Sequence, residues 1–129
     1  MKKKILIISG GISKERVISL DTGRQVKKEL IKNGYNVKIT EPDYKLLEVI
    51  KLFKPSIIFN GLHGQFGEDG YIQTILESTS IPYTHSGVYS SRLAMDKELS
   101  RIIFKKNKDC CSILTYIFLW IFWFRWIAM

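Results

Sequence analysis

The chain has 129 residues, a length that gives room for one domain of ordinary size and excludes two full domains. Its composition, 46% hydrophobic and 25% charged, is that of a folded protein and excludes a disordered or collagen-like chain. A formal net charge of +8 permits an anionic partner such as nucleic acid or phosphate but does not require one.

The composition changes abruptly near residue 109. All three tryptophans and both cysteines follow Asp109, and Arg125 is the only charged residue after it. Seven aromatic residues fall within residues 113–129. We therefore expect a globular domain over residues 1–109 and an aromatic, apolar tail over residues 110–129 that is not a domain.

The tail is a poor candidate for a membrane span. Its apolar part, about 17 residues, only reaches the lower length limit for a transmembrane helix, and Arg125 would be costly inside a bilayer. We expect no membrane contact, although an evolved membrane anchor remains the rival explanation of the tail. Because no signal-peptide pattern begins the chain, and the adjacent Cys110 and Cys111 cannot form a disulfide across the fold, we predict a cytoplasmic protein.

The first predicted elements are a strand and a helix. Residues 5–9 are a short apolar run that ends at two glycines, which predicts a strand buried on both faces. Ser13 then caps a helix that ends at Gly34, and Gly23 is expected to pack closely against a neighbour. The apolar residues of this helix are expected on one face: Val17, Leu20, Val26, Leu30 and Ile31.

The next segment repeats the alternation. We predict a strand over residues 37–40, a helix over residues 46–53 and a third strand over residues 56–60. This β-α-β-α-β order predicts an α/β fold, a Rossmann-like parallel sheet with right-handed crossovers and helices on both faces.

Four shorter elements complete the predicted domain. They are a helix over residues 70–78, a strand over residues 82–84, and two successive helices over residues 86–95 and 97–107.

In a parallel sheet the ligand site lies in the loops beyond the carboxyl ends of the strands. The first such loop, residues 10–15, offers glycines that allow a ligand to approach and a helix start with free N–H groups. Neither the G-x-G-x-x-G nor the Walker spacing is present. Glu15, in the first helical turn, could receive a substrate ammonium; the alternative, which spacing alone favours, is that it only complements the helix dipole.

The second loop, residues 63–70, holds one imidazole, two carboxylates and three glycines. Asp69 is expected to cap the following helix. His63 and Glu68 form a better functional pair, because a carboxylate can fix the tautomer of an imidazole that then donates to a substrate carboxylate. We expect no metal site, since a metal needs further ligands and His85 is the only other histidine.

The last predicted helix begins at Asp96 and Lys97. Asp96 is expected to be its N-cap, and Lys97 points at solvent or at an anion. The other lysines have helical spacings that indicate an ordinary solvated face: Lys27, Lys28, Lys32, Lys105, Lys106 and Lys108. No aromatic residue is interleaved among them, so we expect no nucleic-acid partner.

Three separated motifs together resemble a known family. They are residues 10–20 (GGISKERVISL), residues 63–73 (HGQFGEDGYIQ) and residues 81–97, which run from IPYT through SGV to Asp96 and Lys97. In their order and spacing these motifs resemble those of D-alanine–D-alanine ligases. The resemblance covers residues 4 to about 108 and only the N-terminal, pre-ATP-grasp domain of that family.

The resemblance implies a reaction and roles for individual residues. In this family ATP phosphorylates the carboxylate of the first D-alanine, and the amino group of the second attacks the acyl phosphate to give the dipeptide of peptidoglycan. Glu15 would be the catalytic residue that binds the first ammonium and orients the closing loop, and His63, held by Glu68, would lie by the carboxylate. Lys97 would reach ATP phosphate. His85 departs from the glycine usual at its position, and we assign it no role.

The residues after Lys108 resemble nothing in the family. ATP and Mg²⁺ are implied by the family, but their main binding residues are absent from this chain. We therefore expect an ATP-dependent carbon–nitrogen ligase by family whose isolated chain cannot complete the reaction, as a truncated or frameshifted gene would give. The alternatives are a non-catalytic amino-acid or peptide-binding module and a non-functional fragment, and a homodimer is compatible with all three.

Overall fold

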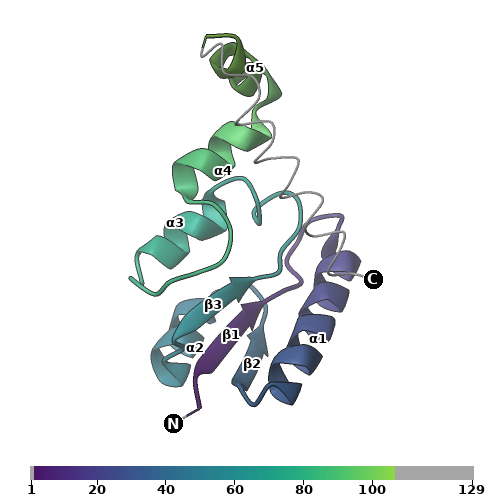
Figure 1. Cartoon of the computed structure of the whole chain (residues 1–129), viewed down its shortest axis with the longest axis vertical. Coiled ribbons are helices and arrows are strands. Elements are labelled where there is room, and N and C mark those ends of the chain that lie inside the picture. The colour runs from purple at the N-terminus through teal and green to yellow at the C-terminus, as the bar shows by residue number, and fades with distance from the viewer. Residues whose placement is uncertain (1, 107–129) are drawn as a thin grey trace. The chain divides into compact units, whose positions relative to one another are not determined.

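The computed structural model describes residues 2–106, shown as the coloured part of Figure 1. These residues form two compact units, a first that ends at Met95 and a second that begins at Asp96. The predicted tail over residues 110–129, and the predicted division at residue 109, lie outside the described residues.

A parallel three-stranded sheet forms the centre of the first unit. Its strands are β1 (Lys4–Ile8), β2 (Asn36–Thr40) and β3 (Ile57–Asn60), in the order β2-β1-β3. The central strand β1 pairs with both neighbours, so that Ile5 lies opposite Val37 on one side and Ile57 on the other. The predicted Rossmann-like α/β fold is confirmed, since all three strands run parallel. The apolar run of β1 is buried along most of its length, as expected of a strand that is covered on both faces.

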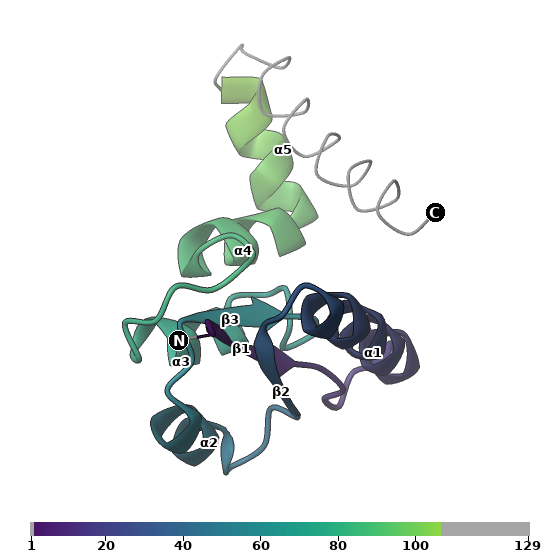
Figure 2. The same cartoon turned by 60° about the horizontal axis from the view of Figure 1, so that its bottom comes forward.

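Helices cover both faces of this sheet (Figures 1 and 2). Helix α1 (Arg16–Lys32) packs on β1 and β2, and α2 (Leu46–Phe53) packs on the same two strands from the opposite face. Helix α3 (Tyr71–Glu77) adds two buried residues to the core on the α2 side. That core consists of Leu6, Ile8, Leu46, Ile50, Ile58, Leu62, Ile72 and Leu76.

The predicted buried face of α1 is partly wrong. Val17 is 73% exposed and Ile31 is 51% exposed, whereas the fully buried positions of the helix are Ser19 and Gly23. An alanine-type Cβ built on Gly23 would lie 2.5 Å from the Ser9 hydroxyl oxygen, so the helix approaches the strand backbone more closely than large side chains allow. The small residues therefore form the contact between α1 and the sheet, and the apolar residues of the helix lie at the edges of that contact.

The predicted N-cap residue is found at the start of one helix and not at the start of another. The N–H of Leu99 donates to the Asp96 carboxylate at 2.9 Å, as expected of an N-cap for α5 (Lys97–Lys106). Ser13 is not the cap of α1, because Glu15 occupies the N-cap position and makes no side-chain capping bond. The Ser13 hydroxyl instead accepts the N–H of Glu15 at 3.0 Å and so orders the turn before the helix.

The elements after β3 are shorter than predicted. The expected strand over residues 82–84 is a single parallel bridge between Tyr83 and Ile58, and α4 (Val88–Met95) begins two residues later than expected. Within residues 2–106 no helix is both long and apolar enough to cross a bilayer.

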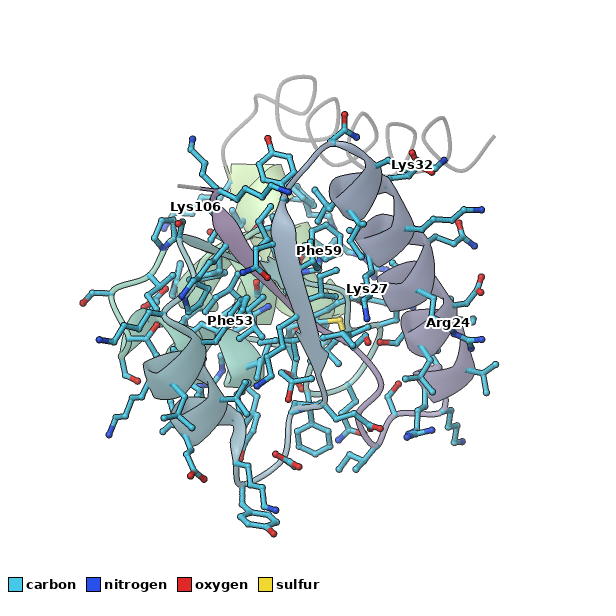
Figure 3. The ribbon with its side chains drawn as sticks, turned by 90° about the horizontal axis from the view of Figure 1, so that it is seen from below. Arg24, Lys27, Lys32, Phe53, Phe59 and Lys106 are labelled. Atoms are coloured by element: carbon cyan, nitrogen blue, oxygen red, sulfur yellow. The ribbon has the colours of Figure 1, made fainter. Side chains whose placement is uncertain are left out.

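Basic side chains project from the surface of α1, where Figure 3 labels Arg24, Lys27 and Lys32. Lys32 forms an exposed ion pair with Glu29 at 2.6 Å, one turn away. Lys32 therefore has the solvated, charge-paired position that the lysine spacing predicted.

Candidate functional site

The loops that follow β1 and β3 meet at the carboxyl edge of the sheet. A single buried hydroxyl, that of Ser19, accepts the N–H of Gly10 at 2.8 Å and donates to the carbonyl oxygen of Gly61 at 2.7 Å. Because Ser19 belongs to α1, this side chain ties the first loop, the residue that directly follows β3 and the helix together.

We expect Ser19→Ala to lower the free energy of unfolding by about 2 kcal/mol, because it leaves a buried N–H and a buried carbonyl without their partner. Urea unfolding of the chain measures this. The matched control is Ser78→Ala, which removes an exposed hydroxyl bonded to the Ile75 carbonyl and should change the stability by less than about 0.5 kcal/mol. Equal losses in the two variants would contradict the assigned role of Ser19.

A second link brings Glu15 to the loop of His63. The Ser13 hydroxyl donates to the His63 carbonyl at 2.8 Å. A Cβ built on Gly64 would lie 3.4 Å from both the carboxyl carbon and Oε2 of Glu15, and the φ of Gly64 is +71°. The second loop thus passes the Glu15 carboxylate at van der Waals distance, and the positive φ of Gly64, rather than a lack of space, favours glycine there.

The Glu15 carboxylate is exposed and makes no hydrogen bond or ion pair with any other residue of the part that the structure describes. Its position at the N-cap of α1 is also compatible with a purely dipolar role. The geometry leaves both interpretations of Glu15 open, and its role stays a prediction.

His63 and Glu68 lie side by side, as predicted from their spacing. Nδ1 of His63 is 3.7 Å from Oε1 of Glu68, a distance of electrostatic contact that is longer than a direct hydrogen bond. The neighbouring imidazole lowers the pKa of the Glu68 carboxyl, against the opposing effect of partial burial. The carboxylate is therefore charged at neutral pH and faces Nδ1.

The other ring nitrogen of His63 contacts α1. Nε2 lies 3.1 Å from the Thr22 hydroxyl oxygen. Since Nδ1 faces an acceptor-only carboxylate, we assign the ring proton to Nδ1, so that Nε2 accepts the Thr22 hydroxyl hydrogen in the neutral ring. Donation from Nε2 to a substrate carboxylate therefore requires the second proton, that is, an imidazolium.

Asp69 has a structural position in the same loop. Its two carboxylate oxygens accept the N–H of Phe66 at 2.9 Å and the N–H of Tyr71 at 3.0 Å. Asp69 is therefore not the predicted N-cap of α3, a position that Gly70 occupies; it precedes the cap and accepts the N–H of Tyr71, the first helical residue.

Lys97 opens α5 in the second unit and is exposed. Its predicted contact with a phosphate stays a prediction. Among the described residues, no group of three or more His, Cys, Asp or Glu side chains is arranged to hold a metal ion.

Several residues that hold the site together were not found from the sequence. Glu41, at the end of β2, accepts the N–H of Gly11 at 3.3 Å and pairs with Arg16 at 2.6 Å. Thr22 contacts His63, and Asn60 bonds to Leu62 and Gly67, which lie on either side of His63 in the chain. Only Asn60 had a usable signal, because it is a polar residue at the end of an otherwise apolar strand.

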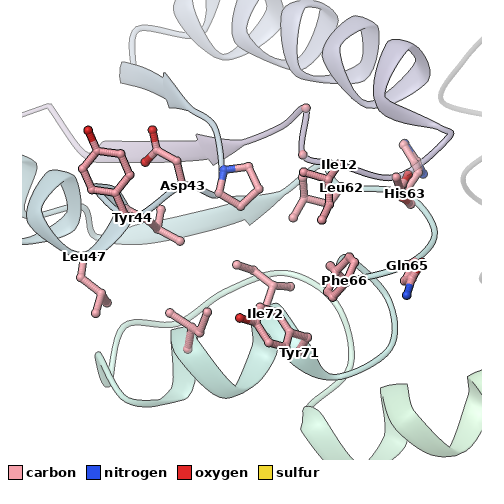
Figure 4. Close-up of a pocket in the computed structure, with 16 residues that line it drawn as sticks. Ile12, Asp43, Tyr44, Leu47, Leu62, His63, Gln65, Phe66, Tyr71 and Ile72 are labelled. Carbon is pink, nitrogen blue, oxygen red and sulfur yellow. Dashed lines mark hydrogen bonds between the residues drawn. The ribbon is translucent and has the colours of Figure 1, made fainter.

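A cavity of about 420 Å³ lies between these loops and α3 (Figure 4). Its walls are mainly apolar, with Ile12, Leu62 and Phe66 among them, and His63 and Gln65 lie together at one side. The cavity is thus bordered by the loop that carries the imidazole.

No protein-family model matches the chain. Individual relatives do match it. A D-alanine–D-alanine ligase of Pelagibacter ubique is 72% identical over 108 residues, which are 84% of this chain and 36% of that protein. The D-alanine–D-alanine ligase of Bartonella bacilliformis is 48% identical over 101 residues, 78% of this chain and 33% of that protein.

Solved structures of proteins with the same name also resemble the chain. The D-alanine–D-alanine ligase of Bacillus anthracis superposes with a TM-score of 0.72 at 35% identity, over 81% of this chain and 35% of that one. The chain thus spans about one third of the length of these relatives. The segment that matches is their N-terminal part, so over most of its length the chain is similar to the N-terminal third of D-alanine–D-alanine ligases.

Proposed function

We propose that this chain acts in the ATP-dependent joining of two D-alanines through an acyl phosphate, for peptidoglycan synthesis, and that it supplies the part that binds the first D-alanine. The observation that carries the proposal is the meeting of two loops: the exposed Glu15 carboxylate lies against Gly64, next to His63. The names of the relatives supply the joining of two D-alanines, and the acyl phosphate and the role in peptidoglycan come from the family resemblance.

The two side chains suit the two ends of an amino acid. A free amino acid carries an ammonium and a carboxylate, and it needs an anionic and a cationic or hydrogen-bond-donating partner within a short distance. Glu15 offers the anion. The imidazolium form of His63 offers the donor at Nε2. Glu68, 3.7 Å from Nδ1, keeps the ring oriented.

ATP is the phosphoryl donor in this proposal, and it would activate the first carboxylate as an acyl phosphate. A solved relative of Bacillus anthracis, with 35% identity and a TM-score of 0.72, is complexed with ATP. In this chain the family resemblance assigns only Lys97 to a phosphate. The described residues do not fit a magnesium ion, since they contain no suitable group of acidic or imidazole ligands, and we derive no step through the metal.

The proposed partners are accordingly D-alanine and ATP, and the proposed location is the cytoplasm, where this precursor chemistry would take place.

A chimera tests the proposed function. Residues 1–106 replace the matched segment of the Pelagibacter ubique ligase, and formation of D-alanyl-D-alanine and phosphate is measured. With intact loops, we expect kcat/KM for D-alanine within about tenfold of the unaltered ligase. The control is the same ligase without its first segment, which should be inactive.

A folded chimera that binds ATP but forms no dipeptide would contradict the proposal. Binding of D-alanine without turnover would then favour a non-catalytic amino-acid-binding module.

A further inference from the structure

His85 has a backbone conformation that residues with a side chain rarely adopt. Its φ is +89°, in the left-handed region that favours glycine, and holding a histidine there stores strain of order 1 kcal/mol or more. Such strain persists where the surrounding contacts fix the residue. The contacts of the His85 ring therefore indicate what holds it in this conformation.

The ring contacts the buried Asn60. Nδ2 of Asn60 donates to the carbonyl of Gly67 at 3.0 Å, and its Oδ1 accepts the N–H of Leu62 at 3.2 Å. These two backbone partners fix which end of the amide is the donor. Since Nδ2 also lies 2.9 Å from Nδ1 of His85, that ring nitrogen must be the acceptor, and the ring proton is on Nε2.

The Asn60 amide in turn holds the second loop. Leu62 and Gly67, its two backbone partners, flank His63 on either side, so one side chain fixes both ends of the segment that presents the imidazole. Gln73 supports the same point, because its Nε2 donates to the Gly67 carbonyl at 2.9 Å.

We propose that His85 is a positioning residue of the substrate site: its neutral ring orients the Asn60 amide, and the amide fixes the loop that carries His63 and Glu68. The substrate is that of the proposed function, but the positioning itself does not depend on it. The charged and titratable groups that influence His85 are Glu68 and His63.

A neutral His85 is consistent with its surroundings. Burial lowers the pKa of His85, Glu68 raises it and His63 lowers it. A proton on Nδ1 would set an N–H against the N–H of Asn60, so the arrangement requires the neutral ring.

The two histidines of the chain give a direct test, because labelling histidine with ¹⁵N yields the spectra of only two rings. At neutral to slightly alkaline pH we expect opposite tautomers, with the proton of His85 on Nε2 and that of His63 on Nδ1. A proton on Nδ1 of His85 would overturn the proposal.

Two substitutions on the full chain separate positioning from a structural role. His85→Gly relieves the backbone strain but removes the acceptor. We expect the melting temperature to be maintained, while the ratio of Nδ1–H to Nε2–H tautomers at His63 falls about tenfold, the equivalent of one lost hydrogen bond. His85→Asn tolerates positive φ and places an oxygen where Nδ1 was, so it should restore the wild-type ratio.

An unchanged His63 spectrum in His85→Gly would overturn the proposal, as would failure of a folded His85→Asn variant to restore the ratio. Thr22→Val is the matched control, since it removes the other partner of His63 and should leave the His85 spectrum unchanged. No substrate is needed for these measurements. An inactive chimera would therefore overturn the proposed function and leave this result standing.

Discussion

In the chimera that carries residues 1–106, Glu15→Gln is expected to reduce kcat/KM for D-alanine by about 30-fold to about 5,000-fold, equivalent to about 2 to 5 kcal/mol of transition-state stabilisation. The substitution keeps the shape of the side chain and removes its charge. If Glu15 pairs with the substrate ammonium, that cation loses its counter-charge when the substrate is bound.

The competing interpretation gives a different result. If Glu15 only complements the dipole of α1, the same change should cost about 0.3 to 1 kcal/mol of stability and leave catalysis nearly unchanged. Kinetics and thermal unfolding are therefore measured on the same protein. A stable variant with a rate reduction below tenfold would end the assignment of Glu15 to substrate binding.

Glu29→Gln is the matched control for this experiment. Glu29 is an exposed acid on the same helix, paired with Lys32 at 2.6 Å and separated from the loops by several turns. Its substitution should leave kcat/KM unchanged, which would show that loss of one negative charge from α1 is not by itself the cause.

Local sequence signals were sufficient to predict the order and the approximate bounds of the strands and of α2. Residues 46–53 were predicted as a helix and form α2 with those bounds, because amphipathic spacing and the following Pro55 both act over a few residues. The strands were predicted to within one residue at most ends, since an apolar run in a parallel sheet needs no knowledge of its partners. The place of the site followed from the same rule, as ligands bind beyond the carboxyl ends of parallel strands.

The sequence did not reveal how closely α1 approaches the sheet. Apolar periodicity favoured a face with Val17 and Ile31, whereas the structure centres the contact on Ser19 and Gly23. Small and polar residues carry little weight in a hydrophobic pattern, although they decide how near two backbones can come.

Contacts between distant residues of the site were equally hidden. His63 and Glu68 are five positions apart and could be paired by inspection, but the bonds from Ser13 to His63 and from Asn60 to His85 join residues 50 and 25 positions apart. The positive φ of His85 depends on such contacts, and the hydrophobic periodicity around it does not predict it.

Because α1 approaches the sheet so closely, Gly23→Ala is expected to destabilise the fold by about 3 kcal/mol, even though alanine is the better helix former by about 1 kcal/mol. The new Cβ would lie 2.7 Å from the Ser9 Cβ and 3.0 Å from Cδ1 of Ile39. Ser9 follows the central strand and is buried, so it cannot move aside as a flexible side chain would. Urea unfolding of the chain measures the change.

A compensating substitution identifies the cause. The Ser9 hydroxyl is buried and makes no hydrogen bond within the described residues, so Ser9→Gly removes the obstructing atoms without breaking one. The double variant Ser9→Gly/Gly23→Ala should regain about 2 kcal/mol as coupling energy, whereas Ser9→Ala should regain less because it keeps the Cβ. Gly34→Ala is the control: it has a φ of +81° but open space around it, so its cost is strain that Ser9→Gly cannot relieve. Strictly additive effects of Ser9→Gly and Gly23→Ala would mean that the helix shifts to accept the methyl group, and that the close approach is not fixed by Gly23.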